Sequence, residues 1–320
     1  MKRICRILAA AALILITIFC FAACKTDEQS EQEPEQAPGQ TQPAPEQPAY
    51  PDGYIFYNAQ EGCSYGEPQR ITYPSAVTGT ARHATVTLPA DYDETKRYPV
   101  LYLLHGLDCD DTSWTGSVYG FVLNAHIIAA NAHFFDGASE MILVSVNSLL
   151  NADESAPSWT SPDLTAVYDL TGREIAESLM PYVNEHYSVL PGRDGAAIAG
   201  FSMGGREAIL TAFAYPDKFC AVGAFSSASF GDNVVSASSY VPDLTLTGEK
   251  FDYVQVTCGS LDTLLPVSEN LKVKLEEAGL SVAYSTPLGI HSPSVWRQAL
   301  NEFVKRIFTK YPKATPVEHF

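Results

Sequence analysis

Basic residues are scarce in this chain. Its 320 residues include 20 Lys and Arg but 37 Asp and Glu, so the formal net charge is −17. A nucleic-acid partner would require a basic surface to contact phosphates, and this balance excludes one. Cysteine is also scarce, with seven residues, which excludes a small fold built on disulfides. Hydrophobic residues make up 46% of the chain, which is typical of a globular protein with a sizeable core.

The N-terminal segment differs from the rest of the chain. Three basic residues near the start precede an apolar run from Ile7 to Cys24. The run ends in Phe21-Ala22-Ala23-Cys24, which resembles a bacterial lipobox, with Phe in a position where Leu is usual. We predict a lipoprotein-type signal peptide at residues 1–23 and a lipid on Cys24; the alternative is an uncleaved transmembrane anchor. Both interpretations place the remaining chain outside the cytoplasm, and the first anchors it at a bacterial cell surface.

A polar segment follows the lipobox. Residues 25–52 hold six Pro, six Gln and seven acidic residues, and no large aliphatic residue. Such a segment cannot bury enough apolar surface to offset its ordering entropy, and its prolines keep it semi-extended. The predicted organisation is therefore a lipidated Cys with a disordered linker at residues 24–53, and a single folded domain at residues 54–320.

Strands and helices alternate along the predicted domain. The nearly continuous apolar run Tyr98–Leu104 is typical of a strand that is covered on both faces. Repeated alternation predicts an α/β fold with a mostly parallel central sheet and helices on both faces. Further strands are expected at Met141–Val146, Ala196–Ala199, Ala221–Phe225, Tyr253–Cys258 and Ser281–Ser285, with an antiparallel edge strand at Arg82–Leu88. Helices are expected at Val118–Ala130, Ile175–Tyr187, Gly204–Ala214, Pro266–Ala278 and Pro293–Phe308.

The strongest local motif is Gly200-Phe201-Ser202-Met203-Gly204, a G-x-S-x-G sequence between an expected strand and an expected helix. In a nucleophile elbow the serine occupies a strained turn, and small residues on both sides are needed. The turn exposes the hydroxyl at the sheet edge. We predict that Ser202 is a nucleophile; the alternative is an ordinary strand–helix turn.

A serine hydroxyl needs a base and a group that orients the base. In hydrolases with this elbow the chain order is serine, acid, histidine. Downstream of Ser202 the histidines are His291, in the loop after the last expected strand, and His319, in the C-terminal tail. We predict that His291 is the base.

The acid is predicted from the position of the strand ends. Asp262 closely follows the apolar strand Tyr253–Cys258, which makes it the preferred acid. Its alternative role is to cap the helix near Pro266. The alternative acids are Asp232, Asp243 and Asp252, none of which directly follows a strongly apolar strand.

Acyl transfer also needs hydrogen-bond donors for the developing oxyanion. We predict that these are the backbone N–H groups of Met203, next to the nucleophile, and of Leu107, in the loop after the Leu101–Leu104 strand. The side chain of His105 in the same loop is predicted to be a structural hydrogen-bonding group rather than a second base.

Four ordered motifs carry a family resemblance. They are Tyr98–Gly106, Ala199–Gly205, Cys258–Asp262 and His291–Trp296. With these motifs, the stretch from about Ile71 to Phe308 resembles the esterase family that includes feruloyl esterases and acetyl xylan esterases, with formylglutathione hydrolases and mycolyl transferases as relatives. The resemblance implies an α/β-hydrolase fold and the triad Ser202, Asp262 and His291. The chain departs from the family pattern at Ser292, where an acidic residue is frequent, and in the short Leu288-Gly289-Ile290 segment, where a glycine-rich run is frequent.

The remaining candidates concern substrate and cysteines. Trp159 lies in the long polar segment Asn147–Asp163, a candidate lid, and is the preferred aromatic wall for a sugar or phenolic group, with Tyr168 nearby. Trp114 and Trp296 are expected to pack in the core. Four cysteines, Cys63, Cys109, Cys220 and Cys258, are expected to be buried thiols or to form at most one bridge.

Together these features predict a cell-surface serine carboxylesterase without metal or organic cofactor. Its expected partners are an ester-bearing plant polysaccharide or oligosaccharide, carrying feruloyl or acetyl groups, and the membrane through the N-terminal lipid. Two alternatives stay open: an acyltransferase that uses the same triad, and a non-catalytic carbohydrate-binding lipoprotein. Location argues against a formylglutathione-type substrate, and the polar Asn147–Asp163 segment argues against mycolyl transfer.

Overall fold

The computed structural model describes residues 48–158, 161, 164–231, 240–248, 250–311 and 314–316. The predicted signal peptide, Cys24 and most of the predicted linker lie outside these residues. In the described part of the chain, no helix has both the length and the apolar character needed to cross a membrane.

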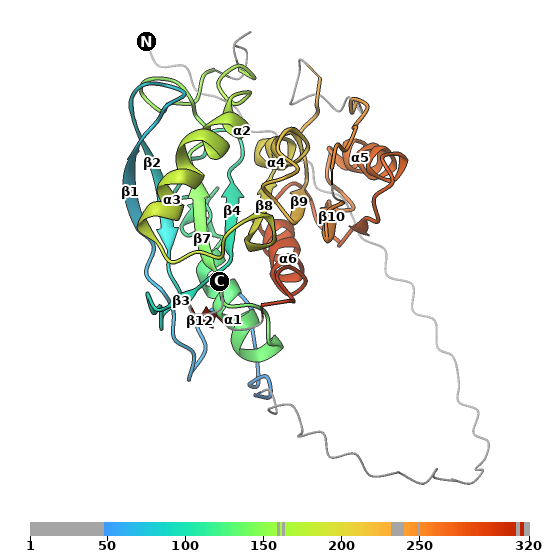
Figure 1. Cartoon of the computed structure of the whole chain (residues 1–320). Coiled ribbons are helices and arrows are strands. Elements are labelled where there is room, and N and C mark those ends of the chain that lie inside the picture. Colours follow the sequence, from blue (N-terminus) through green and yellow to red (C-terminus); the bar gives the residue numbers. More distant parts are fainter. Residues whose placement is uncertain are drawn as a thin grey trace, which may run out of the picture. The chain divides into compact units, whose positions relative to one another are not determined.

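An eight-stranded sheet forms the centre of the fold (Figure 1). Neighbouring strands are parallel from β7 to β11, and the two pairs at the β1 edge are antiparallel. The predicted mostly parallel sheet is therefore confirmed. In spatial order the strands are β1 (Gln69–Pro74), β2 (Ala81–Thr87), β7 (Ile142–Val146), β4 (Val100–Leu104), β8 (Ala196–Phe201), β9 (Ala221–Phe225), β10 (Tyr253–Thr257) and β11 (Ala283–Ser285).

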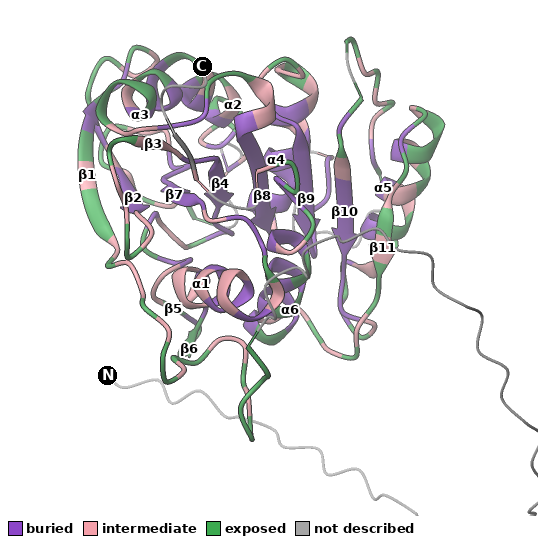
Figure 2. Ribbon diagram, turned by 60° about the horizontal axis from the view of Figure 1, so that its bottom comes forward, coloured by how far each residue is buried: buried purple, intermediate pink, exposed green. Residues whose placement is uncertain are grey.

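Helices cover both faces of the sheet, because alternate side chains of each buried strand point to opposite sides. Val100, Tyr102 and Leu104 of β4 pack into one apolar cluster with α3, α4 and α5, whereas Leu101 and Leu103 pack into another with α1 and α6. In Figure 2 the central strands are accordingly buried, whereas β1 carries exposed segments. The helices are α1 (Ala125–Asp136), α2 (Thr171–Glu174), α3 (Met180–His186), α4 (Met203–Ala214), α5 (Leu265–Glu277) and α6 (Pro293–Val304), with a π-helical turn at Ile175–Leu179 and a 3₁₀ turn at Arg193–Gly195.

Two expectations about the elements are wrong. The helix expected at Val118–Ala130 begins at Ala125, because the preceding residues form a two-stranded hairpin, β5 (Ser117–Val118) and β6 (Phe121–Val122), and Asn124 has a left-handed backbone. The strand expected at the sheet edge, β2, is not the edge strand, because β1 pairs with it and forms the edge. The β1 sequence is mostly exposed and has no clear alternation, so its periodicity did not reveal it.

The four cysteines of the described region are free thiols. Cys220 and Cys258 are buried, and burial raises the pKa of each thiol to about 12. Cys63 and Cys109 are only partly buried. The alternative of one bridge is therefore wrong for this structure.

One further short antiparallel pair joins two strands outside the central sheet. It consists of β3 (Lys96–Arg97) and β12 (Thr315–Pro316), and it brings the C-terminal segment against the rest of the domain.

Candidate active site

Ser202 lies in a strained turn between β8 and α4. Its φ of 56° and ψ of −119° are unusual for a residue with a side chain. Backbone hydrogen bonds hold this conformation: the Ser202 N–H donates to Phe225 O at 2.8 Å, and the Ser202 carbonyl accepts from Ala228 N–H at 2.9 Å. The predicted elbow geometry is therefore present.

The glycines of the motif allow the backbone around Ser202 to pack closely. A Cβ atom on Gly204 would lie 2.2 Å from the Leu104 carbonyl oxygen, and one on Gly200 would lie 2.3 Å from the Gly204 carbonyl oxygen. Both contacts are with backbone, which cannot move aside as a flexible side chain can. The start of α4 can therefore lie against β4 and β8 only if both positions are glycine.

The predicted base and acid lie beside this serine. His291 Nε2 is 3.0 Å from Ser202 Oγ, and His291 Nδ1 is 2.9 Å from Asp262 Oδ2. An ionised carboxylate only accepts hydrogen bonds, so Nδ1–H donates to Asp262 and Nε2 is left to accept the serine proton. The structure thus joins Ser202, His291 and Asp262 in one directed chain of hydrogen bonds.

Asp262 is a buried carboxyl group whose ionised form is favoured. Burial alone would raise its pKa, but hydrogen bonding and charge interaction with His291 and the hydrogen bond from Leu264 N–H, at 2.9 Å, outweigh burial and lower it. An ionised Asp262 can orient the imidazole and stabilise its protonated form. The alternative acids Asp243 and Asp252 instead pair with lysines, Lys274 and Lys310.

Two loops carry the acid and the base, and they bind each other. Ser260 N–H donates to Pro287 O, and Leu261 N–H donates to Gly289 O, each at 2.9 Å. Three aliphatic side chains next to Asp262 and His291 are exposed to solvent: Leu261, Leu288 and Ile290.

His291 also packs against an aromatic side chain that the sequence did not assign to the site. Trp296, which is fully buried as predicted, lies edge-on to the His291 ring at a centroid distance of 5.1 Å and stacks on Phe201 at 4.2 Å. Because it is buried, Trp296 supports the base and does not contact substrate. The sequence signals were its position in the first turn of the helix that follows His291 and its place at the end of the His291–Trp296 motif.

The predicted oxyanion donors, Met203 and Leu107, both belong to segments next to Ser202. Met203 is the first residue of α4, so its N–H has no acceptor within the helix. The loop with Leu107 is pressed against the nucleophile: a Cβ atom on Gly106 would lie 3.2 Å from Ser202 Cβ. Among the described residues, the Leu107 N–H has no hydrogen-bond acceptor. Two backbone donors beside a serine–histidine–aspartate chain can stabilise the oxyanion of acyl transfer.

His105 and Trp114 are structural, as predicted. Ser148 N–H donates to His105 Nε2 at 3.0 Å, so Nδ1 carries the proton and donates to Gly106 O at 2.8 Å. Burial lowers the pKa of His105, which keeps the imidazole neutral. Trp114 is fully buried and donates from Nε1 to Leu104 O at 3.0 Å.

Several residues that the sequence suggested for the site are not part of it as the structure describes it. Tyr168 is fully buried, in an apolar cluster with Leu107 and Met203, so its ring supports the oxyanion loop. Trp159, part of the candidate lid, Asp232 and His319 lie outside the described residues.

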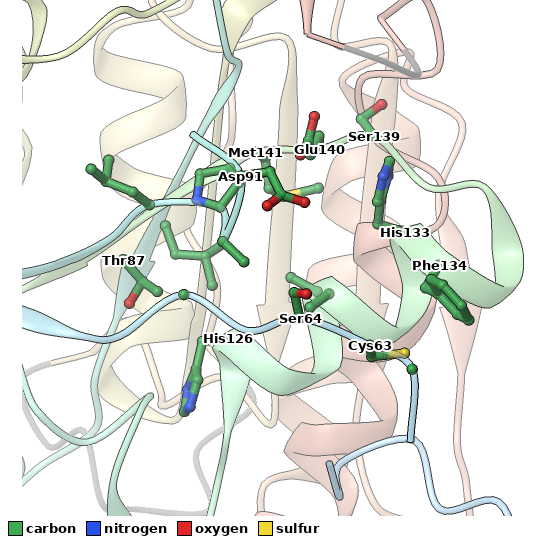
Figure 3. Close-up of a pocket in the computed structure, with 18 residues that line it drawn as sticks. Cys63, Ser64, Thr87, Asp91, His126, His133, Phe134, Ser139, Glu140 and Met141 are labelled. Atoms are coloured by element: carbon green, nitrogen blue, oxygen red, sulfur yellow. The ribbon is translucent and has the colours of Figure 1, made fainter. Parts of the chain in front are cut away.

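A separate cavity lies at the opposite end of the parallel strands (Figure 3). It has a volume of about 230 Å³ and is lined by residues from α1, by the segment that follows β2 and by the segments that precede β1 and β7. Ser64, Asp91, His126 and Glu140 are among its lining residues. In the described part of the chain, no group of three or more His, Cys, Asp or Glu residues could hold a metal ion.

The chain is similar to known esterases in sequence and in structure. Residues 75–307 match the family model described as "Putative esterase". A curated relative, an endo-1,4-β-xylanase/feruloyl esterase of Xylanibacter ruminicola, is 25% identical over 262 residues, which cover 79% of this chain and 33% of the relative. The chain thus spans about a third of the length of that relative.

Two solved structures of other proteins are also similar to this chain. A ferulic acid esterase of the anaerobic fungus Anaeromyces mucronatus is 28% identical, with a TM-score of 0.70 and coverage of 79% of this chain and 94% of that one. The S-formylglutathione hydrolase of Staphylococcus aureus is 20% identical, with a TM-score of 0.58 over 79% of this chain and 100% of that one. The second likeness concerns the fold alone. The central sheet and these neighbours establish an α/β-hydrolase fold.

Proposed function

Because the chain belongs to this esterase family, we propose that it is a serine carboxylic ester hydrolase and that Ser202, His291 and Asp262 are its catalytic triad. The observation that carries the assignment is the directed hydrogen-bond chain from Asp262 through His291 to the strained Ser202. We further propose that the substrates are feruloyl or acetyl esters of plant polysaccharide.

The geometry supports a two-step reaction. Ser202 Oγ attacks the ester carbonyl while His291 Nε2 takes its proton, and the N–H groups of Leu107 and Met203 hold the oxyanion. The protonated His291, oriented by Asp262, then donates its proton to the leaving alcohol, and the acyl group stays on Ser202. Water attacks the acyl-enzyme in the same way, with His291 again as base, which releases the carboxylic acid and restores Ser202.

Two comparisons support a feruloyl substrate. The curated relative and the more similar solved structure are both named as feruloyl or ferulic acid esterases. An acetyl ester is smaller and can occupy the same reacting position. The experiment is to compare kcat/KM for methyl ferulate, acetylated xylan and long-chain lipid esters. Activity on at least one of the first two supports the proposal, whereas activity on lipid esters alone contradicts the polysaccharide assignment.

We also propose that the enzyme is a lipoprotein at the bacterial cell surface. The support is the lipobox-like Phe21–Cys24 sequence followed by a Pro- and Gln-rich segment. A polysaccharide is too large to import intact, so an enzyme that acts on it is useful outside the cell. Replacement Cys24→Ala should release the protein from the membrane fraction and abolish palmitate labelling. Labelled palmitate on the Cys24→Ala protein would contradict the assignment.

A further inference from the structure

The β5–β6 hairpin has an unusual turn. Tyr119 and Gly120 join the two strands, and both have positive φ, 52° and 80°. A two-residue hairpin loop with positive φ at both positions is a type I′ turn, in which Asn-Gly is the preferred pair. A bulky aromatic residue at the first position is unfavourable. The turn itself therefore gives no reason for a tyrosine.

The hairpin is held firmly at its base. Val118 is buried, Leu123 N–H donates to Gly116 O at 2.8 Å, and Arg297 Nη1 of α6 donates to Val122 O at 3.0 Å. These contacts hold the backbone without help from the Tyr119 ring. Tyr119 remains 59% exposed.

Tyr119 lies next to Trp296, the tryptophan that packs against the base. Its ring is 6.4 Å from that of Trp296, which contacts His291. Partial burial, and to a smaller extent the charges of Cys109 and Asp108, raise the pKa of the Tyr119 phenol. Asp108 and Cys109 follow Leu107 in the loop of the predicted oxyanion donors. An exposed aromatic residue on a firmly held hairpin thus lies one ring beyond the tryptophan that packs against the base.

We propose that Tyr119 is a subsite for the sugar ring that carries the ester, an inference that rests on the proposed function. A pyranose or furanose has an apolar C–H face that can stack on an aromatic ring, and hydroxyls that can bond to the phenol and to the exposed carboxylate of Asp108. The ring faces solvent, where the polymer must remain while only its ester enters the site. Tyr119 therefore binds the alcohol part of the substrate, not the acyl part.

The test uses a substitution that preserves the turn. Tyr119→Asn creates the preferred type I′ pair with Gly120 and should keep or raise Tm, but it removes the ring. We measure kcat/KM for a feruloylated arabinoxylan oligosaccharide and for methyl ferulate, which has the same acyl group and no sugar. The ratio of the two values should fall about three- to tenfold, mainly through KM for the sugar ester.

Tyr119→Phe is the matched control. It keeps the ring and should retain most of the wild-type ratio, so a merely structural role of the side chain cannot produce the expected pattern. An unchanged ratio in Tyr119→Asn, or an equal fall in Tyr119→Phe, would overturn the subsite while leaving the proposed function intact. A wild-type protein inactive on both esters would overturn the proposed function, and the subsite with it.

Discussion

The two ends of the central sheet hold similar chemical groups in different arrangements. At the carboxyl end of the parallel strands, Ser202, His291 and Asp262 form a chain of hydrogen bonds. At the opposite end, two serines, two histidines and two carboxylates line a cavity of about 230 Å³ (Figure 3). Among the described residues there, no hydrogen bond joins Ser64, His126 and Asp91.

The difference shows that orientation, rather than the presence of reactive groups or a large cavity, distinguishes the candidate active site. Both nitrogens of His291 are directed, one by an ionised carboxylate and one toward a strained serine. At the cavity, His126 Nδ1 and Thr87 Oγ1 are buried with no partner in the described part of the chain. The other cavity histidine, His133, pairs its Nδ1 with the Ala138 carbonyl, so among the described residues neither histidine is oriented by a carboxylate as His291 is.

The largest expected effect is the loss of the nucleophile. Ser202→Ala should fold but lower esterase turnover by about ten-thousand-fold or more, because no other group can form the acyl-enzyme. Ester hydrolysis and covalent labelling by a fluorophosphonate measure it. The matched variant at the opposite end, Ser64→Ala, should keep wild-type turnover. Near-wild-type activity of Ser202→Ala would contradict the proposed role of Ser202 as the nucleophile.

The next effect is smaller because the nucleophile and base remain. Asp262→Asn should lower kcat by about a thousand- to ten-thousand-fold, since an amide no longer holds His291 in the required tautomer. Circular dichroism checks that the protein is folded. Asp91→Asn at the cavity should leave kcat unchanged. A silent Asp262→Asn substitution would mean that another acid orients His291.

A third comparison concerns two glycines that lie under close backbone contacts. A Cβ atom on Gly204 would lie 2.2 Å from Leu104 O, and one on Gly66 would lie 1.7 Å from Leu88 O. Both Gly204→Ala and Gly66→Ala should therefore destabilise the fold, by about 3 kcal/mol or more. Only Gly204→Ala should also lower kcat of the folded fraction, because it displaces the elbow. Denaturant unfolding and active-site titration separate the two effects, and equal kcat values would show that the elbow tolerates the displacement.

The smallest effect is on acid stability. Burial lowers the pKa of both His105, at the catalytic end, and His126, at the cavity. As the pH falls, these histidines bind protons in the unfolded state before they do so in the folded state. Their contribution to the free energy of unfolding is therefore complete above the unfolded pKa of about 6.5 and is lost as the pH falls below it. His126→Asn should make the fall of Tm between pH 7 and pH 5 smaller by about 1–3 °C without changing turnover at pH 7. An unchanged fall of Tm would mean that His126 does not contribute.

Most of the catalytic end could be predicted from local patterns. The G-x-S-x-G sequence specifies a strained turn within five residues, and the apolar strand before Asp262 places this acid at the same sheet edge. Chain order then selects His291. The β5–β6 hairpin was missed, because apolar residues from Val118 onward have helical spacing, and a tyrosine in a left-handed turn violates the usual preference.

Local patterns were sufficient to predict the elbow glycines, the apolar strands and the loops that carry Asp262 and His291. Which of these groups meet depends on the tertiary structure. Ser202 and His291 are 89 positions apart and yet share a hydrogen bond, and Tyr119 and Trp296 come together from separate elements. Backbone preferences act over a few residues, whereas such contacts depend on how helices pack against the sheet, and no short pattern encodes that packing.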